Sequence, residues 1–244
     1  MKSTIWCLAA ILVSLSVEAP LQGEPDADAA CPNTDTTSLI ERFLTREEPP
    51  LRAYRAHRTL RAINPRFRAE ATLEAITELL ADGTFRYQIV REEGSGSVRT
   101  RVLHAVLKDE QRLWQRGDPR RSSLSADNYT FRLDEIATAP APDTADAAWL
   151  IGITPLRRDV LLVEGRIAVD STGDLLRVEG RLPKNPSFWT SRVDVVRQYA
   201  RLGGVRVPVL TTSVAHVKIA GRSEFQMTYR YESINGELVT TDTK

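Results

Sequence analysis

The residues of this chain that could carry chemistry are its histidines, serines and acidic pairs. His57, His104 and His216 lie far apart, and none has a ligand partner four residues away, as a helical metal site requires. The segment 94–97, Gly-Ser-Gly-Ser, lacks both the order of a hydrolase nucleophile turn and the third glycine of a dinucleotide loop. We therefore expect no catalytic residue, no metal ligand and no cofactor, and we expect the protein not to be an enzyme.

The acidic residues lead to the same expectation. Asp170 and Asp174 flank a glycine turn, but a calcium loop needs a higher density of oxygen ligands. Glu92 and Glu93 stand beside the Gly/Ser segment, where carboxylates face solvent. A triad assembled from distant residues leaves no local pattern, so an enzyme stays open as an alternative.

Alternating apolar residues are the more informative pattern. Over residues 224–232 one face of a strand would carry Phe225, Met227, Tyr229 and Tyr231, and the other face would carry charged and polar side chains. Phe85, Tyr87 and Ile89 alternate in the same way on an earlier predicted strand, and Trp189 begins the predicted strand 189–201. The candidate ligand-binding residues are thus Phe85, Tyr87, Ile89, Trp189, Phe225, Met227, Tyr229 and Tyr231. The same set fits an ordinary core, and the pattern leaves both interpretations open.

A period of two dominates the chain and predicts a sheet with one wet face and one covered face. Glycine turns separate successive segments, which indicates an antiparallel meander, since parallel strands need long crossovers. Pro208 cannot donate to a ladder, so its strand should be bulged or split. The predicted strands are 69–80, 84–91, 159–169, 174–182, 189–201, 205–219 and 223–234.

Two helices are expected to accompany this sheet. A short one begins at Thr36 or Thr37 and ends before Pro49. A longer amphipathic one covers 98–116, with Ser97 placed to cap its start. The segment 51–63 fits either period. The fold class is therefore α+β and rich in β structure.

The N-terminus predicts export. Lys2, an apolar run over 5–17 and Ala19 match a cleavable signal peptide over residues 1–19. An acidic, Pro- and Ala-containing leader over 20–35 is expected to be disordered, and the folded domain spans 36–236, followed by a short tail over 237–244. We expect a periplasmic protein with no transmembrane segment in its mature part. Cys31 is then an unpaired thiol, or alternatively a lipid anchor that lacks the expected apolar residue three positions earlier.

The charge of the whole chain is close to neutral, at +1, which gives no field that would attract nucleic acid. Arginines nevertheless gather over 52–68, without the interleaved aromatic residues of a single-strand-binding groove. We interpret them as a solvated face. They are Arg52, Arg55, Arg58, Arg61, Arg66 and Arg68.

The segment 160–209, VLLVEGRIAVDSTGDLLRVEGRLPKNPSFWTSRVDVVRQYARLGGVRVPV, resembles the paired strands of the outer-membrane lipoprotein-sorting-like proteins of the LolA/LolB type. The order of elements over 36–235 is similar to that family as well. The resemblance implies an incomplete antiparallel β-barrel, a curved sheet covered by helices, whose concave apolar face receives acyl chains.

The leading hypothesis is accordingly a noncatalytic envelope protein that buries lipid or lipoprotein acyl chains on the concave face, with the helices acting as a lid. The alternative is an interaction or sensor domain on the same fold, with a closed core and an envelope protein as its partner. An open apolar cavity would favour the first hypothesis and a filled core the second.

Overall fold

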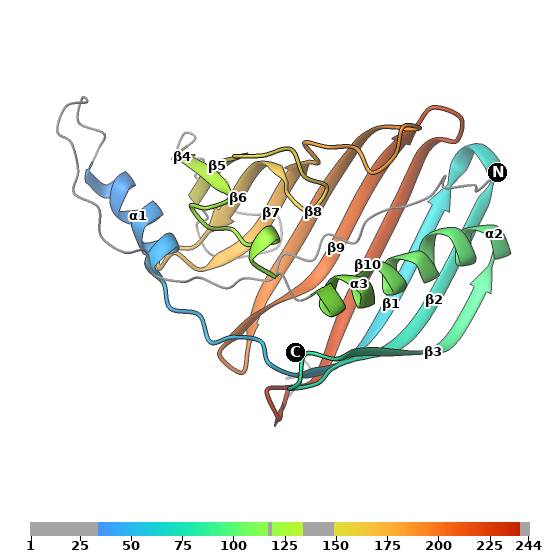
Figure 1. Ribbon diagram of the computed structural model, residues 1–244, viewed down its shortest axis with the longest axis horizontal. Coiled ribbons are helices and arrows are strands. Elements are labelled where there is room, and N and C mark those ends of the chain that lie inside the picture. The colour runs from blue at the N-terminus through green and yellow to red at the C-terminus, as the bar shows by residue number, and fades with distance from the viewer. Residues whose placement is uncertain (1–33, 117–118, 134–148, 240–244) are drawn as a thin grey trace.

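The computed structural model describes residues 34–116, 119–133 and 149–239. One large antiparallel sheet makes up most of it, and the strands follow the order β3-β2-β1-β10-β9-β8-β7-β6-β5-β4, with the short β11 beside β10 (Figure 1). The sheet curves without closing, and helices lie over its inner face. The predicted fold class, a β-rich incomplete barrel with covering helices, is confirmed. The predicted signal peptide, Cys31 and nearly all of the predicted leader lie outside the described residues.

The strands agree closely with the period-two pattern. The ambiguous segment 51–63 is a strand from Tyr54 onward, and the strands that the pattern did not predict are β4, β5 and the short β11. Of the predicted strand 159–169, only Glu164–Val169 is a strand. The bounds are β1 Tyr54–Asn64, β2 Ala69–Leu79, β3 Phe85–Gly94, β4 Tyr129–Leu133, β5 Trp149–Pro155, β6 Glu164–Val169, β7 Leu175–Arg181, β8 Thr190–Leu202, β9 Val205–Val217, β10 Gly221–Ile234 and β11 Glu237–Leu238.

The helices also follow the prediction, with one difference. Helix α1 spans Thr34–Thr45. The expected helix over 98–116 is present as three consecutive pieces, α2 Gly96–Val98, a π-helical turn Arg99–Leu103 and α3 His104–Arg116. Ser95, rather than Ser97, occupies the N-cap position, and it makes no capping hydrogen bond through its side chain. Two single-turn 3₁₀ helices complete the described helices, Pro65–Phe67 and Pro119–Ser122.

One long-range strand pair joins the two halves of the sheet. Strands β1 and β10 run antiparallel in a register that sets Tyr54 opposite Ile234 and Ile63 opposite Glu224. The remaining pairs along the order join strands that are consecutive in the chain. The β8–β9 pair has a bulge at Pro208, where Tyr199 pairs with Pro208 and Gln198 with Leu210, and the β1–β10, β2–β3 and β6–β7 pairs contain further register shifts. The predicted bulge is thereby confirmed. The pairing of β1 with β10 makes the sheet one continuous curved surface.

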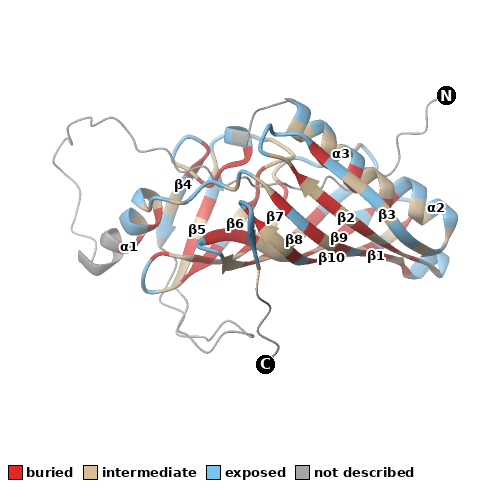
Figure 2. Ribbon diagram, turned by 90° about the horizontal axis from the view of Figure 1, so that it is seen from below, coloured by how far each residue is buried: buried red, intermediate tan, exposed pale blue. Residues whose placement is uncertain are grey.

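The two faces of the sheet differ as the alternation predicts. Along β1 and β10, buried residues on the inner face alternate with exposed or half-buried residues on the outer face (Figure 2). The outer face carries surface ion pairs such as Arg61 with Glu70, at 2.6 Å, and Arg55 with Glu232, at 2.7 Å. These pairs confirm the solvated-face interpretation for Arg55 and Arg61.

Helix α1 is fastened to the β6–β7 turn at the far end of the sheet from α2 (Figure 1). Arg42 donates to the Ser171 carbonyl at 2.9 Å, and the ring of Phe43 lies 5.8 Å from that of Phe131. Gly173, at φ +80°, lets the turn approach the helix backbone, because an added Cβ would lie 3.0 Å from the Phe43 nitrogen.

A cluster of charged side chains continues this attachment beyond α1. The buried Glu48 carboxylate and Asp174 bind Arg201 at 3.0 and 2.8 Å, and both also contact Arg206. Arg46 adds a contact to Glu48 at 3.2 Å. Burial alone would raise the pKa of Asp174, but the arginine hydrogen bonds and charges outweigh it and lower that pKa below its ordinary value.

The lowered pKa of Asp174 predicts a pH-dependent stability. A carboxylate with a lower pKa in the folded than in the unfolded state stabilises the fold above its unfolded pKa, about 3.9, and this stabilisation is lost as the pH falls through the folded pKa. Asp174→Asn should reduce the free energy of unfolding at pH 7 by about 1 to 2 kcal/mol. The difference from wild type should shrink as urea unfolding is repeated at progressively lower pH. Asp127→Asn, at an exposed position, is the matched control; an equal loss in both variants, or a pH-independent one, would contradict the account.

Candidate functional site

The candidate ligand-binding residues separate into a packed group and one outlier. Phe85, Phe225, Met227, Tyr229 and Tyr231 are buried in the hydrophobic core, and Tyr87 and Ile89 are half-buried against it. Within this group Tyr229 stacks on Tyr231 with the ring centroids 6.1 Å apart, and Phe85 contacts Tyr87 at 6.3 Å. Trp189 lies elsewhere, at the start of β8, with 36% of its surface exposed.

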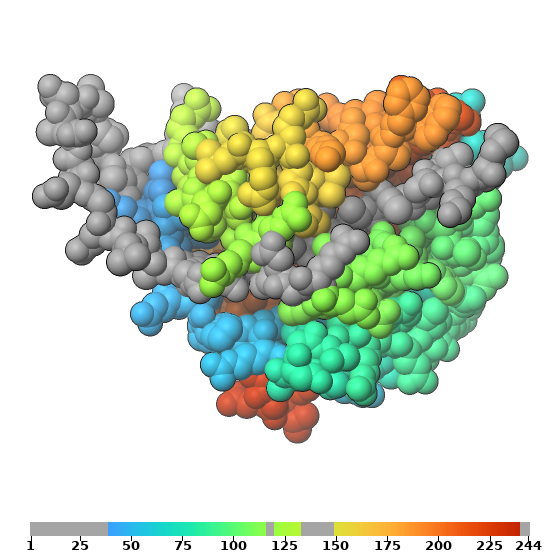
Figure 3. All heavy atoms as spheres, viewed as in Figure 1, coloured from blue at the N-terminus to red at the C-terminus, as the bar shows by residue number. Residues whose placement is uncertain are grey.

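The packed group lies beneath a buried ion pair that comes from the helix. Glu110 of α3 points at the sheet and accepts a hydrogen bond from Arg58 of β1 at 2.9 Å, and Arg58 also donates to the Tyr54 hydroxyl. The Arg58 guanidinium lies over the Tyr229 ring, 4.6 Å from its centroid, and over Phe85 at 5.6 Å. Burial opposes the charge, but the Glu110 carboxylate outweighs it and raises the pKa of Arg58. The Arg58 guanidinium therefore stays charged, and its hydrogen bonds to Glu110 hold α3 against the sheet. On the molecular surface, α3 and β3 are continuous (Figure 3).

The solvated-face interpretation was wrong for Arg58, whose exposed fraction is 3%. The physical reason is its register. Tyr54, Ala56, Arg58 and Leu60 alternate on the inner face of β1, so the arginine shares the face of apolar residues.

A second buried arginine lies on the same inner face, one strand beyond β9. Arg197 of β8 is 4% exposed and donates to the Thr211 hydroxyl at 3.3 Å. No carboxylate of the described residues forms an ion pair with it, and the nearby Tyr199 hydroxyl is buried without a hydrogen-bond partner there. The centre of the inner face is thus aromatic and charged. Such a surface does not suit an acyl chain, because the chain would cover charged groups without hydrogen-bonding them.

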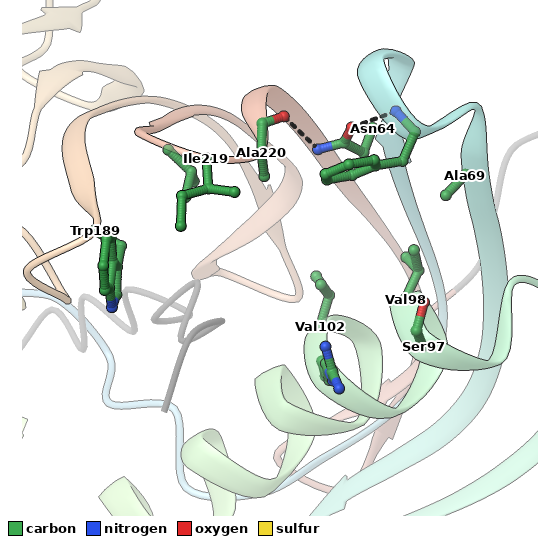
Figure 4. Close-up of a pocket in the computed structure, with 11 residues that line it drawn as sticks. Asn64, Ala69, Ser97, Val98, Val102, Trp189, Ile219 and Ala220 are labelled. Atoms are coloured by element: carbon green, nitrogen blue, oxygen red, sulfur yellow. Dashed lines mark hydrogen bonds between the residues drawn. The ribbon is translucent and has the colours of Figure 1, made fainter. Parts of the chain in front are cut away.

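An open apolar cavity occurs instead at one end of the inner face. We call it the end groove; its volume is about 280 Å³, and its main lining residues are Phe67, Val98, Val102, Trp189, Val217 and Ile219. Figure 4 shows Val98 and Val102 on the helical side of the groove, opposite Trp189 and Ile219. Of the eight candidate residues, Trp189 is the one that lines it.

A hydrogen-bonded asparagine holds the rim of the end groove in shape. The Asn64 amide donates to the Ala220 carbonyl at 3.0 Å and to the Ser223 hydroxyl at 2.8 Å, and its oxygen accepts from the Phe67 amide at 3.0 Å (Figure 4). The Trp189 carbonyl accepts from the Lys218 amide at 2.8 Å. Three turns distant in sequence are thereby fixed beside one another.

The helical side of the end groove is the π-helical turn Arg99–Leu103, which contains Val102 and Arg101. Single π-helical turns inside α-helices occur frequently at functional sites, because the extra residue displaces side chains from the regular face. Arg101 is exposed at the edge of the groove, and no carboxylate of the described residues pairs with it. An apolar groove with one cation at its edge has the chemistry to bind an amphiphile with an acidic head group.

Most of this groove leaves no periodic pattern in the sequence, because its walls come from turns and helix ends. A signal was present: Phe67 and Ile219 are large apolar residues inside Arg- and Gly-containing turns, where polar residues are the norm. No group of His, Cys, Asp and Glu side chains in the described ranges could hold a metal ion. Nor does that part of the chain contain a helix of the length and apolarity needed to cross a membrane.

Comparison with known proteins finds no matching family model and no match among curated proteins. The fold is similar to a Vibrio parahaemolyticus domain described as outer membrane lipoprotein-sorting, at 10% identity over 85% of this chain and 95% of that one, with a TM-score of 0.41. A DUF1329 family protein from Desulfovibrio piger matches at 10% identity over 80% and 90% of the two chains, also with a TM-score of 0.41. A lipoprotein-sorting domain is thus among the similar structures, as the sequence resemblance predicts. The similarity is too loose to carry function, which must be argued from this chain's own residues.

The buried ion pair makes a prediction about stability. Glu110→Ala leaves the Arg58 guanidinium buried without a counter-charge, and the free energy of unfolding should fall by about 3 to 5 kcal/mol. The double variant Arg58→Met with Glu110→Leu replaces the pair by apolar groups and should recover most of that loss. Urea unfolding of the single and double variants measures both values.

The exposed pair Arg61–Glu70, from the same strand, is the matched control. Glu70→Ala should cost less than about 1 kcal/mol, because water replaces the lost partner. A Glu110→Ala protein as stable as Glu70→Ala would contradict the role given to the buried pair.

Proposed function

We propose that the protein is a noncatalytic binding protein for an apolar ligand, and that an acyl chain of a lipid or lipoprotein binds in the end groove. The observation that carries this proposal is an open cavity with apolar walls. The walls come from α2 and the π-helical turn after it, the β1–β2 turn, the β7–β8 loop, the end of β9 and the β9–β10 turn. An unliganded apolar groove is an unfavourable surface in water, and covering it releases that cost.

The size of the groove limits what it can bind. A volume of about 280 Å³ lies at the lower end of small-molecule sites, which span about 300 to 1,000 Å³. It has room for part of one chain, and each methylene buried there contributes about 0.8 kcal/mol. A single acyl chain with its acidic head group near Arg101 is the ligand that this arrangement fits best.

The proposed site lies at one end of the sheet and not at the concave centre that the sequence resemblance implies. The concave centre, where the candidate residues gather, is occupied by core packing and by the Arg58–Glu110 pair. Seven of the eight candidate residues therefore do not line the groove, and Trp189 keeps the role of a wall residue. For α3 to act as a lid over the centre, the buried pair would have to break.

We propose the cell envelope as the compartment. The support is the signal-like pattern of Lys2 and the apolar run over 5–17, together with a ligand that the envelope contains in quantity.

The second candidate function is an interaction or sensor domain that binds an envelope protein. A specific observation favours it, namely the filled centre of the sheet. On this hypothesis the end groove would take an apolar side chain of the partner, and a free fatty acid would bind poorly.

Ligand binding can be tested at Ile219, which lines the groove with 55% of its surface exposed. A charge at this position should leave the fold intact and repel an acyl chain. We expect Ile219→Asp to weaken the binding of a dansyl-labelled undecanoic acid by at least about tenfold, because a charged group now borders the buried methylenes. Fluorescence titration measures the dissociation constant.

Leu238→Asp is the matched control, since Leu238 is an exposed apolar residue away from the groove. Its affinity should equal that of wild type. Met227→Glu separates groove from core: at 2% exposure the buried charge should unfold the protein. A wild-type protein that binds no probe, or an Ile219→Asp protein that binds as wild type does, would overturn the proposed function.

A further inference from the structure

Large apolar side chains protrude into solvent around the mouth of the end groove. Phe188 is 79% exposed, and Phe67 and Ile219 are more than half exposed. They come from three separate connections: the β7–β8 loop, the β1–β2 turn and the β9–β10 turn. Figure 1 shows the β1–β2 turn, the β9–β10 turn and α2 at the same end of the sheet. The groove lining and the Lys218–Trp189 hydrogen bond place the β7–β8 loop there as well.

Basic residues are concentrated in the connections at this end of the molecule, while the nearest carboxylates, such as Glu70, Glu92 and Asp194, lie on the adjoining strands. The four segments that form this end are 64–69, 95–102, 182–193 and 216–222, which we call the end surface. They contain eight basic residues and no acidic one, although the whole chain has a net charge of only +1. The eight are Arg66, Arg68, Arg99, Arg101, Lys184, Arg192, Lys218 and Arg222.

Several of these cations have no internal counter-charge. Arg99, Arg192 and Arg222 pair with the carboxylates of neighbouring residues. For Arg66, Arg68, Arg101 and Lys184, no ion pair occurs among the described residues, and all four are exposed. Lys218 lies 4.2 Å from the centre of the Phe188 ring, so a cation and an aromatic side chain protrude together.

We propose that the end surface docks on an anionic lipid bilayer. Aromatic side chains favour the boundary between head groups and acyl chains, and unpaired lysines and arginines are attracted to anionic head groups. The exposed apolar residues come from three connections and surround the mouth of the end groove, with cations beside them. This arrangement suits insertion of the apolar side chains between anionic head groups.

This proposal deepens the proposed function, because the mouth of the groove opens on the surface that would meet the bilayer. An acyl chain could then pass between membrane and groove without crossing water. Docking itself depends on Phe188 and Lys218, which do not line the groove, so the two proposals can fail separately.

The test is cosedimentation of the exported, processed chain with sucrose-loaded vesicles. Vesicles of phosphatidylcholine with about a third phosphatidylglycerol should bind the protein, and pure phosphatidylcholine should bind it at least about tenfold more weakly. Raising the salt concentration should weaken binding to the anionic vesicles, since exposed charges are screened. Wild-type protein that stays in the supernatant with anionic vesicles overturns the proposal and would point to an acidic protein as the partner.

Two variants locate the contact. Arg66→Glu with Lys218→Glu should lower the partition onto anionic vesicles by more than about tenfold, and Phe188→Ser by about fivefold. The matched controls are Arg52→Glu with Arg230→Glu, and Leu238→Ser, all exposed and outside the end surface. Equal losses in variants and controls would mean that net charge or total apolar surface governs binding, which overturns the proposal.

The dansyl-undecanoic acid titration distinguishes docking from ligand binding. Phe188→Ser should keep the affinity of wild type for the free probe while it loses vesicle binding. A variant that loses both in parallel would mean that the vesicles bind through the groove alone, and docking by the end surface would be wrong.

Discussion

The ion pair between Arg58 and Glu110 determines which part of the inner face is closed. It links the middle of β1 to the middle of α3, and both side chains are almost completely buried. Removing either partner would leave the other charge buried without a counter-charge, which lowers the free energy of unfolding strongly. With the helix held there, Tyr54, Phe85 and Tyr229 pack around the guanidinium and fill the centre of the curve. The preceding π-helical turn packs on β1, β2 and β3 at the end of the strands and forms the helical side of the apolar groove.

A second electrostatic anchor acts at the opposite end of the molecule. Glu48 and Asp174 bind three arginines between them, and so connect the chain after α1 to the β6–β7 and β8–β9 turns. The inner face is consequently divided along its length: α1 and the ion cluster hold one end, α3 closes the middle, and the end groove stays open. The end groove is an apolar part of the inner face that neither anchor covers.

The hairpins were predictable from sequence because a period of two and glycine turns are local signals. Residues 174–182 and 223–234, for example, were placed to within two residues of β7 and β10. The pairing of β1 with β10 was not predictable in this way, because it joins residues about 170 positions apart and leaves no local trace. Strand β4 was missed since only five residues, Tyr129–Leu133, form it.

The site was harder to predict than the fold. The alternating apolar residues at 225–231 identified the inner face correctly. Such a pattern does not distinguish the wall of a ligand cavity from a packed core. Here the core is closed by Glu110, a residue of a distant helix that binds Arg58. Arg58 is a second example. An arginine is usually a surface residue, but the alternation along β1 places Arg58 on the buried inner face. The position of Trp189 at the groove depends on neighbours that are distant in sequence, and so it is visible only in the folded chain.

The central claim is that an acyl chain binds in the end groove and leaves the centre of the sheet closed. Photo-crosslinking with a diazirine-labelled fatty acid, followed by mass spectrometry of the peptides, tests it directly. The account predicts label on the groove segments 95–102 and 217–220 and on Trp189, with none on 225–231. Label concentrated on Met227, Tyr229 or Tyr231 would contradict it and would mean that α3 opens to admit the ligand.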